Sequence, residues 1–413
     1  MLATCLGCGC VCDDIQLHVE GNRIVDAHNA CPLGARWFGD GGAPSRILVR
    51  GRDASLDEAL TGAAELMKGA SRPLVFLAPD ISCEAQRSAI AIADALRGTV
   101  DSVTSATAIA TLLAAQEGGR ASATLGEIRN RADVVVFWGV DPSRRYPRFW
   151  SRYAPEPTGV HVGGRLSRTI VAVDVGSARG PEDADIRVAV MPDREVTTLT
   201  ELTAAATAGD RHGHHAATLR SGQLQPDVLE TLLRGKYLAI VTDAEPDDES
   251  EPRDEGRRAA LAAFAQALNG PTRCALISLR GGGNRSGADA CLTAQTGYPM
   301  AVDFSRGYPR YRPYDNAGVR VARGMVDAVL IVGSVASVPP ALIADVARLP
   351  TVVIGPRATE QAPQAVVAID TGVVGIHESG TALRLDDVAL PLTGTITGPP
   401  ATFEVVAALA GRL

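Results

Sequence analysis

Five cysteines near the start of the chain are the residues best suited to chemistry. Cys5, Cys8, Cys12 and Cys31 follow the spacing C-x2-C-x3-C-x18-C, and Cys10 lies between them. Thiolates are soft ligands, so four of them brought together can close a tetrahedral site around Zn²⁺ or hold an iron–sulfur cluster. The alternative is a set of thiols that only pack in a core, but four cysteines at ligand spacing favour metal binding.

A short β-hairpin is expected to bring Cys31 back to the other three cysteines. Alternating apolar residues predict strands over 15–19 and from 24, and residues 20–22 supply the turn between them. The acidic pair at 13–14 follows the third cysteine directly. It can accept backbone N–H groups of the cysteine loop, or it can simply form a turn.

Strands and helices alternate through the rest of the chain, which predicts an α/β fold. A capping box from Ser55 to Glu58 predicts a helix to about Gly69, and Ser82 is expected to cap a helix over 83–97. Continuous apolar runs between helices indicate parallel strands buried on both faces, in more than one doubly wound sheet. The expected strands are 74–77, 133–138, 170–173, 238–241, 275–279, 328–332 and 352–354.

Two glycine-containing segments are candidate ligand loops. Residues 281–283 and 333–334 each follow an expected strand. Ligands bind beyond the carboxyl ends of strands in open α/β sheets, but glycine-rich strand exits are also ordinary tight turns. The loop chemistry by itself leaves both interpretations open.

Three other features favour structural interpretations. Cys83 begins a helix, where the dipole lowers a thiol pKa and can create a nucleophile, but a small buried residue is the favoured interpretation. His212, His214 and His215 have no carboxylate or cysteine at ligand spacing, which favours a solvated segment over a metal site. Residues 243–258 are strongly charged and are predicted to form a solvated loop.

The bulk composition predicts a cytoplasmic globular protein. A chain of 413 residues is too long for one ordinary core, so two to three domains are expected. The net charge of −7, without a basic stripe, argues against nucleic acid. Neither a signal peptide nor a long apolar run is recognisable, which predicts no membrane association. The cysteines are clustered rather than spread as a disulfide framework, which fits a reducing compartment. No G-x-S-x-G, P-loop or H-E-x-x-H motif occurs.

Long motifs across nearly the whole chain resemble the B subunit of formylmethanofuran dehydrogenase, which is the tungsten- or molybdenum-pterin subunit of an archaeal complex. The resemblance rests on CLGCGCVCDDI with ACPLG, SCEAQRSAIAIADALRG, TLGEIRNRADVVVFWGVDPSRRYPRFWSRY, LISLRGGGNRSG, AQTGYPMAVDFSRGYPRY and GIHESGTALRLDDVALPL. It implies the scaffold of the molybdopterin oxidoreductase superfamily. The expected domains are a cysteine-rich β lobe over 1–50, a discontinuous α/β domain over 51–118 and 236–390, a second α/β domain over 119–235, and a tail over 391–413.

The same resemblance implies a role for the cysteines. In that family the N-terminal cysteines hold a [4Fe–4S] cluster beside the pterin, and the motif match assigns this role to Cys5, Cys8, Cys12 and Cys31, with Cys10 as an additional thiol. Zn²⁺ needs no redox partner and suits a closed site of four thiolates. A zinc ion, a [4Fe–4S] cluster and an empty site therefore stay open as alternatives.

The chain departs from the family at the position of its catalytic pair. The archaeal enzymes carry a metal-ligating Cys or selenocysteine followed by His, whereas the matching segment here, DSVTSATAIA over 101–110, places Thr107 and Ala108 at those positions. A threonine hydroxyl is hard and weakly basic, so it does not replace a soft thiolate on tungsten or molybdenum. Alanine has no proton to transfer. Redox catalysis is therefore expected to be lost.

The expected cradle for the pterin is also altered. The family's Pro-Arg-Lys-Thr after the strand ending at Asp174 is replaced by VGSAR, and its His-Pro-Arg is replaced by Tyr146-Pro147-Arg148. A relic of the family's R-G-x-x-N-x-x-G loop is retained. Its residues are Arg280, Gly281, Asn284 and Gly287.

This degenerate form resembles the B subunit of the formyltransferase/hydrolase complex of methylotrophic bacteria. The resemblance implies a non-redox scaffold without molybdopterin or tungstopterin. Its partners would be three other subunits of that complex. The A subunit is an amidohydrolase that hydrolyses the formyl group, the C subunit is a β-solenoid, and the D subunit transfers the formyl group from a tetrahydromethanopterin carrier to a methanofuran-like carrier. The alternative is a working pterin-dependent dehydrogenase, since some relatives in the superfamily ligate the metal through oxygen.

Overall fold

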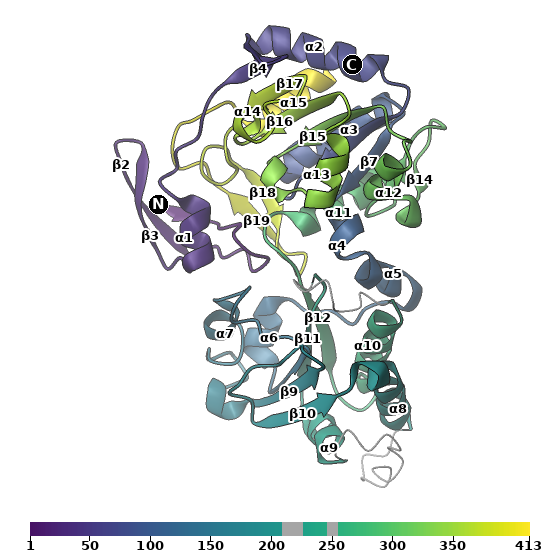
Figure 1. Ribbon diagram of the computed structural model, residues 1–413. Helices are drawn as coiled ribbons and strands as arrows, with labels where there is room; N and C mark the ends of the chain where they lie inside the picture. Colours follow the sequence, from purple (N-terminus) through teal and green to yellow (C-terminus); the bar gives the residue numbers. More distant parts are fainter. Residues whose placement is uncertain (209–225, 246–254) are drawn as a thin grey trace. The chain divides into compact units, whose positions relative to one another are not determined.

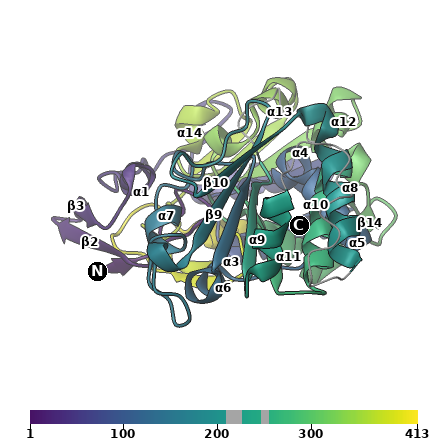
Figure 2. The ribbon, with the colours of Figure 1, turned by 90° about the horizontal axis from the view of Figure 1, so that it is seen from below.

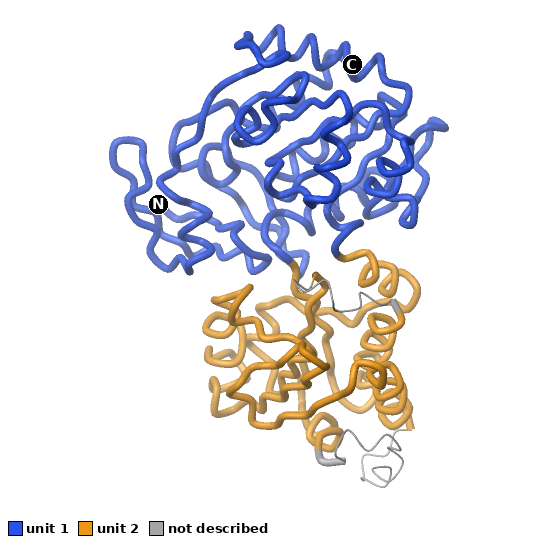
Figure 3. The backbone as a smooth tube through the Cα atoms, in the orientation of Figure 1, with its two compact units in different colours: residues 1–107, 281–413 blue, residues 108–280 orange. Residues whose placement is uncertain are grey.

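The chain folds into two compact units. The computed structural model describes residues 1–208, 226–245 and 255–413. Unit 1 comprises residues 1–107 and 281–413, and unit 2 comprises residues 108–280 (Figure 3). His212, His214 and His215 lie outside the described residues. Among the described residues, no helix combines the length and apolar character needed to cross a membrane.

Unit 1 is built on a nine-stranded sheet whose five central strands are parallel (Figure 1). Antiparallel strands extend both ends, because β13 pairs with β7 and β4 pairs with β17. The order across the sheet is β14 (Arg310–Tyr311), β13 (Val302–Asp303), β7 (Thr99–Ser102), β6 (Pro73–Leu77), β15 (Ala328–Val332), β16 (Thr351–Gly355), β17 (Val367–Asp370), β4 (Ile47–Val49) and β5 (Arg52–Asp53).

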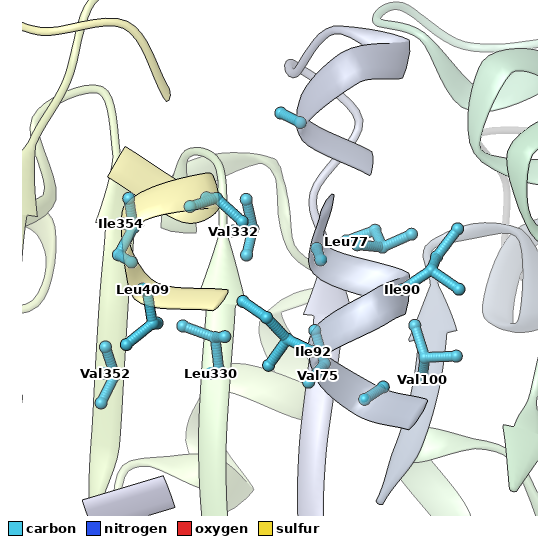
Figure 4. Packing of buried hydrophobic residues seen from close by; sticks show 14 of the residues in the cluster. Val75, Leu77, Ile90, Ile92, Val100, Leu330, Val332, Val352, Ile354 and Leu409 are labelled. Carbon is cyan, nitrogen blue, oxygen red and sulfur yellow. The ribbon is translucent and has the colours of Figure 1, made fainter. Parts of the chain in front are cut away.

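Helices cover both faces of this sheet, which explains the continuous apolar runs in its strands. Val75 and Leu77 of β6 pack with Ile92 of α3, whereas Leu74 and Phe76 belong to the core on the other face (Figure 4). Successive residues of a strand alternate between faces, so a doubly covered strand is apolar throughout. The helices are α2 (Leu56–Gly69), α3 (Cys83–Ala95), α11 (Arg285–Thr296) and α15 (Thr402–Ala410) on the first face and α12 (Ala317–Ala322), α13 (Pro340–Val346) and α14 (Ala358–Gln361) on the other.

The cysteine segment forms a small lobe of unit 1. Strands β1 (Leu2–Ala3), β2 (Ile15–Glu20) and β3 (Arg23–His28) form an antiparallel sheet, followed by α1 (Pro32–Phe38). The predicted hairpin is therefore present. A second hairpin packs against the lobe through Leu6, Val11 and their apolar neighbours; its strands are β18 (Gly380–Leu383) and β19 (Ala389–Leu392).

Unit 2 has a five-stranded parallel sheet in the order β10-β9-β8-β11-β12. Helices α6 and α7 lie on one side of the strands, and α8 and α10 lie on the other (Figure 2). Its elements are α5 (Ile109–Gly118), α6 (Leu125–Arg131), β8 (Val134–Trp138), α7 (Phe149–Arg152), β9 (Thr169–Val175), β10 (Ile186–Val190), α8 (Glu195–Thr207), α9 (Pro226–Arg234), β11 (Leu238–Asp243), α10 (Glu255–Leu268) and β12 (Cys274–Leu279).

The structure divides the chain differently from the expected domains. Strands β11 and β12 join the sheet of unit 2 rather than the discontinuous domain, since β11 pairs with β8. The C-terminal segment is not a tail, because Val406 and Leu409 of α15 are fully buried in the core of unit 1. Apolar runs in parallel strands carry no information about which sheet they join.

Three parallel strands were not predicted from the sequence. The residues of β7 are largely polar, and Asp101 and Ser102 are buried there by hydrogen bonding rather than by apolar character. Strand β10 lies at a sheet edge, where its residues alternate between buried and exposed rather than forming a continuous apolar run. Strand β17 has only four residues. The expectation of a solvated loop over 243–258 is wrong at its described ends, because Asp243 ends β11 and Arg257 and Arg258 are buried in α10. Residues 246–254 lie outside the described residues.

Candidate functional site

The cysteine loop is a tight turn closed by its own backbone. The N–H of Cys5 donates to the carbonyl of Cys12 at 2.8 Å, and the N–H of Val11 donates to the carbonyl of Cys8 at 3.1 Å. Val11 adopts a φ of 39°, a left-handed conformation that a branched residue rarely takes. Cys31 immediately precedes α1 as its N-cap residue. The fold thus presents four cysteines from a loop and a helix start in one lobe.

Cys5 lies near the other three predicted ligands. Burial raises the pKa of Cys5 most strongly, and the neighbouring thiols of Cys8, Cys12 and Cys31 raise it further. A Cβ built on Gly34 would lie 3.3 Å from the sulfur of Cys5 and 4.0 Å from that of Cys31. The four predicted ligands are therefore gathered, with one glycine-sized gap beside two of them.

Thiols are suitable ligands for a soft metal, but the side-chain conformations of these cysteines do not form a coordination site. All eight cysteines lie among the described residues, and none is joined in a disulfide. Within the described ranges, no group of three or more His, Cys, Asp or Glu is placed to hold a metal ion. Ligation by all four thiols therefore requires other side-chain rotamers. Burial raises the pKa of the Cys5 thiol, so this cysteine stays protonated unless a cation stabilises the thiolate.

Cys10 is a fifth thiol inside the same lobe. It is fully buried, and its pKa is raised by a hydrogen bond with Cys8 and then by burial, while Arg384 acts in the opposite direction. Arg384 is itself held by Asp386 through two contacts of 2.7 Å. The β18–β19 hairpin therefore places a guanidinium group near the cysteine loop, and the N–H of Leu385 donates to the carbonyl of Gly9 at 3.2 Å.

The relic loop connects the cysteine lobe to the main sheet of unit 1. Gly283 adopts a φ of 88° and its N–H donates to the carbonyl of Leu6 at 2.8 Å. A Cβ on Gly282 would lie 2.8 Å from the carbonyl oxygen of Gly7. Glycine is therefore required at both positions, because Gly283 has a positive φ and the backbone of the cysteine loop leaves no room for a side chain at Gly282.

Asn284 is the central brace of this loop. It is fully buried, and its Nδ2 donates to the carbonyl of Ile81 at 3.0 Å. Its Oδ1 accepts from the N–H of Leu383 at 2.8 Å, and its backbone carbonyl accepts from Nε2 of Gln86 at 3.0 Å. The amide thus joins the β6 exit, α3 and β18. Gly287 is packed directly against this side chain.

The relic residues are divided between the two units of the chain. Gly281, Asn284 and Gly287 belong to unit 1, whereas Arg280 ends unit 2, where its guanidinium pairs with Glu245 at 3.0 Å. Both members of that pair are buried. Arg280 is therefore neutralised by a carboxylate of its own unit.

Other strand exits of unit 2 are occupied by internal ion pairs as well. Arg145 contacts Asp243 at 2.5 Å, and the Tyr146 hydroxyl lies 3.5 Å from the same carboxylate. Asp174, at the altered exit of β9, accepts from Arg187 at 2.7 Å and from the N–H of Gly180 at 2.8 Å. In each case a carboxylate of unit 2 accepts from an arginine of the same unit.

Thr107 ends a short helix, α4 (Thr104–Thr107), that is anchored by Asp101. The buried carboxylate of Asp101 accepts hydrogen bonds from Ser102, Ser105, Ala301 and Ala317, at 2.7 to 3.0 Å. The hydroxyl of Thr107 donates to the carbonyl of Val103 at 2.9 Å. The hydroxyl therefore points to the turn that precedes α4, and it also accepts from the guanidinium of Arg285 at 3.5 Å. Ala108 is buried and is the first residue of unit 2.

The two remaining candidates have structural positions. Gly333 adopts a φ of 107° and packs against Asp80, whose carboxylate accepts from the N–H of Ser334 at 3.0 Å, so this exit is a tight turn. Cys83 lies in the core beside Cys291. Contact with Cys291 and donation from Asn284 lower the pKa of Cys83, but its burial keeps a substrate from reaching the thiol.

Glu378 is a buried carboxyl group that the sequence did not single out. Its Oε2 accepts from the N–H of Thr402, whereas its Oε1 is buried without a hydrogen-bond partner. Burial raises the pKa of Glu378 to about 8, with the nearby Glu404 and Glu84 adding to the shift. Its neighbour His377 accepts from the N–H of Val373 through Nδ1 and donates to the carbonyl of Gly41 through Nε2, and burial lowers its pKa. No sequence pattern distinguishes such a glutamate from an exposed one.

We expect Glu378→Gln to stabilise the protein at neutral and mildly alkaline pH. The unfolded carboxyl ionises near its ordinary pKa of 4.5, whereas the folded one keeps its proton to about pH 8. Stability is therefore lost as the pH rises through that window, and glutamine removes the loss, which amounts to roughly 2 to 4 kcal/mol at pH 7.5. Denaturant unfolding at pH 4 and pH 7.5 measures it. The exposed Glu404→Gln should show no comparable gain, and an equal gain at both pH values would contradict the assignment.

Comparisons with known proteins were made with this fold and site in hand. No model of a protein family matches the chain. The chain is 31% identical to the B subunit of the tungsten-containing formylmethanofuran dehydrogenase 2 of Methanococcus maripaludis, over 96% of this chain and 93% of that protein. The corresponding protein of Methanocaldococcus jannaschii is 30% identical over the same shares. The B subunit of the formyltransferase/hydrolase complex of Methylorubrum extorquens is 27% identical over 88% of this chain and 96% of that protein.

The solved structures agree with the fold. The crystal structure of the formyltransferase/hydrolase complex of Methylorubrum extorquens, in complex with methylofuran, contains a chain that superposes with a TM-score of 0.72. It is 23% identical and covers 89% of this chain and 98% of that chain. The class is thus a mixed α/β protein with parallel sheets. The chain belongs to the family of the formylmethanofuran dehydrogenase B subunit, as the motifs predicted, and is related to the B subunit of the formyltransferase/hydrolase complex.

Proposed function

We propose that this protein is the non-redox scaffold, or B subunit, of a cytoplasmic formyltransferase/hydrolase complex in methylotrophic one-carbon metabolism. Its partners would be the amidohydrolase, β-solenoid and formyltransferase subunits, which together transfer a formyl group between carriers and hydrolyse it to formate. The observation that carries the proposal is Thr107, because it stands where the family's metal-ligating thiolate is expected. Its hydroxyl donates to the carbonyl of Val103, just before α4, and accepts from the guanidinium of Arg285 at 3.5 Å.

The former cofactor loops support the same proposal. Asn284 and Gly283 are fully used in joining segments of unit 1, and Arg280 and Arg145 are paired with carboxylates of unit 2. These residues therefore have structural roles that need no pterin. These structural roles support the proposal that the loop sequence serves the fold.

The second candidate function is that of a pterin-dependent formylmethanofuran dehydrogenase. It is favoured by the 31% and 30% identity to tungsten-containing relatives over most of their length. In that case Thr107 would supply an oxygen ligand. A hard secondary alcohol is a poor substitute for a thiolate on a soft metal, which weighs against this function.

Elemental and pterin analysis of the complex purified from its native cells separates the two functions. We expect less than about 0.1 tungsten, molybdenum or pterin per chain, together with formyl transfer and hydrolysis that survive Thr107→Val. A stoichiometric content of pterin and metal would overturn the scaffold proposal. Loss of a dye-linked formyl oxidation in the Thr107→Val complex would support the dehydrogenase.

For the cysteine quartet we propose a bound metal held by Cys5, Cys8, Cys12 and Cys31, either Zn²⁺ or a [4Fe–4S] cluster. Zinc would supply only a cross-link between the loop and α1, whereas a cluster would add an electron carrier. Visible absorbance and iron and zinc content of the purified complex distinguish these two from an empty site.

A further inference from the structure

We propose that an exposed edge of unit 1, the Arg–Tyr edge formed by Arg306, Tyr308, Arg312 and Tyr314, is the docking surface for a carboxylate-rich face of a partner protein in the complex. This inference rests on the proposed function within a multi-protein complex and names one surface through which that complex would assemble. None of these four exposed side chains belongs to a hydrophobic core cluster among the described residues.

The Arg–Tyr edge lies at one end of the nine-stranded sheet. Strand β14 is the terminal strand, paired only with β13, and Figure 1 shows the hairpin that joins them at the periphery of unit 1. Arg306 and Tyr308 lie in the turn of this hairpin, and Arg312 and Tyr314 closely follow β14. The edge of a sheet is where a further chain can be added or a partner can dock.

The side chains of this edge are exposed, and its two arginines lack a carboxylate. Tyr308 and Tyr314 are 54% and 68% exposed, which is unusual for aromatic side chains. Arg306 and Arg312 are also exposed, and neither makes an ion pair with any described residue. By contrast, the neighbouring Arg310 contacts Asp303 at 2.6 Å. The acidic residue of the hairpin, Asp303, is thus already used, and the two outer guanidinium groups are left for an external partner.

The hairpin beneath the edge is held in place before any partner binds. The rings of Tyr298 and Tyr311 stack at 5.1 Å with an angle of 6° between their planes. Arg320 contacts Asp315 at 2.9 Å, and the N–H of Arg312 donates to the carbonyl of Ala301 at 2.9 Å. A surface that is already ordered loses little conformational entropy on binding.

The chemistry of the edge specifies its partner. Tyrosine and arginine are among the side chains most enriched at the energetic centres of protein interfaces. Guanidinium groups bind carboxylates in a bidentate manner, so two exposed arginines beside two exposed tyrosines favour a partner surface that carries carboxylates. An acidic face of another protein, with apolar area to accept two phenol rings, satisfies these requirements.

Charge reversal in the full-length chain within its native complex tests the inference. We expect Arg306→Glu with Arg312→Glu to reduce the amount of one partner protein recovered with the tagged chain by at least about tenfold. The matched control is Arg348→Glu, an exposed arginine just beyond α13 in the same unit, which should leave recovery unchanged. Quantitative mass spectrometry of the purified complexes provides the measurement, and circular dichroism confirms that each variant is folded.

A photoreactive benzophenone side chain in place of Tyr308 gives a second readout that leaves the charges intact. Charge reversal is expected to reduce the recovery of one partner protein. We expect the benzophenone to cross-link to an Asp- and Glu-rich segment of that same protein. Recovery within about twofold of wild type, or cross-links that join two copies of this chain or reach a non-acidic segment, would overturn the docking surface. If wild type recovers the amidohydrolase, β-solenoid and formyltransferase partners but the variants do too, only this inference fails. If wild type recovers none of them, the proposed function fails and this inference with it.

Discussion

Asn284→Ala is expected to lower the free energy of unfolding by about 3 to 5 kcal/mol, because it leaves several buried groups without partners. The carbonyl of Ile81 and the N–H of Leu383 lose bonds of 3.0 and 2.8 Å, and the fully buried site offers no water in compensation. Denaturant unfolding of the purified chain measures the change. Asn130→Ala, which removes a partly exposed amide bonded to the N–H of Val160, should change stability by less than about 1 kcal/mol.

This result bears directly on function, since Asn284 belongs to the loop that resembles a pterin site. If the loop serves the fold, destabilisation appears in protein that contains no pterin. Unchanged unfolding, combined with an altered pterin content, would instead show that the loop holds a cofactor and would favour the dehydrogenase. The same variant therefore separates a structural from a cofactor-binding role.

Cys12→Ala is expected to release the metal of the N-terminal lobe and to destabilise that lobe by at least about 3 kcal/mol, since loss of one of four ligands removes most of the binding free energy. Metal content by elemental analysis and thermal melting of the purified complex measure the two effects. A chelator should act on wild type in the same direction. Unchanged melting would count against a bound metal.

Cys10→Ala is the matched control for this variant. Cys10 is fully buried in the same loop but lies outside the predicted ligand set, so its replacement should retain the metal and change stability by about 1 kcal/mol. The opposite outcome, in which Cys10→Ala loses the metal and Cys12→Ala keeps it, would reassign the ligands. Gly34 offers an independent probe, because an alanine there would place a methyl group against the sulfur of Cys5.

Under the proposed function, the difference between this chain and a redox enzyme lies in a few side chains rather than in the fold. The sheets, the cysteine lobe and the braces at Asp101 and Asn284 are complete. A scaffold held by such internal hydrogen bonds can lose a metal ligand at Thr107 without losing its shape. Because the fold does not depend on the metal ligand, one fold can serve both a dehydrogenase and a formyltransferase/hydrolase complex. The relatives of this chain include a B subunit of each kind.

Several features of this protein were determined by its sequence alone. The capping box is present as predicted, with the N–H of Glu58 donating to Ser55 and the N–H of Ser55 donating to Glu58. Ser82 caps α3 by accepting from the N–H of Ala85. The predicted apolar runs are buried strands, the cysteine hairpin is formed, and the family was evident from its motifs. These features depend on residues close together in the sequence, where spacing and side-chain type suffice.

The tertiary structure alone decided which strands share a sheet and what the polar residues do. Strands β11 and β12 belong to unit 2 although their apolar runs are indistinguishable from those of unit 1. Asn284 bonds to residues about one hundred and two hundred positions away, and Glu378 bonds to Thr402 under burial that raises its pKa. Burial and hydrogen-bond partners arise from long-range packing, which local patterns do not encode. The sequence therefore pointed to the cysteines, and the fold showed that the loop at 280–287 contacts their lobe through Gly282 and Gly283.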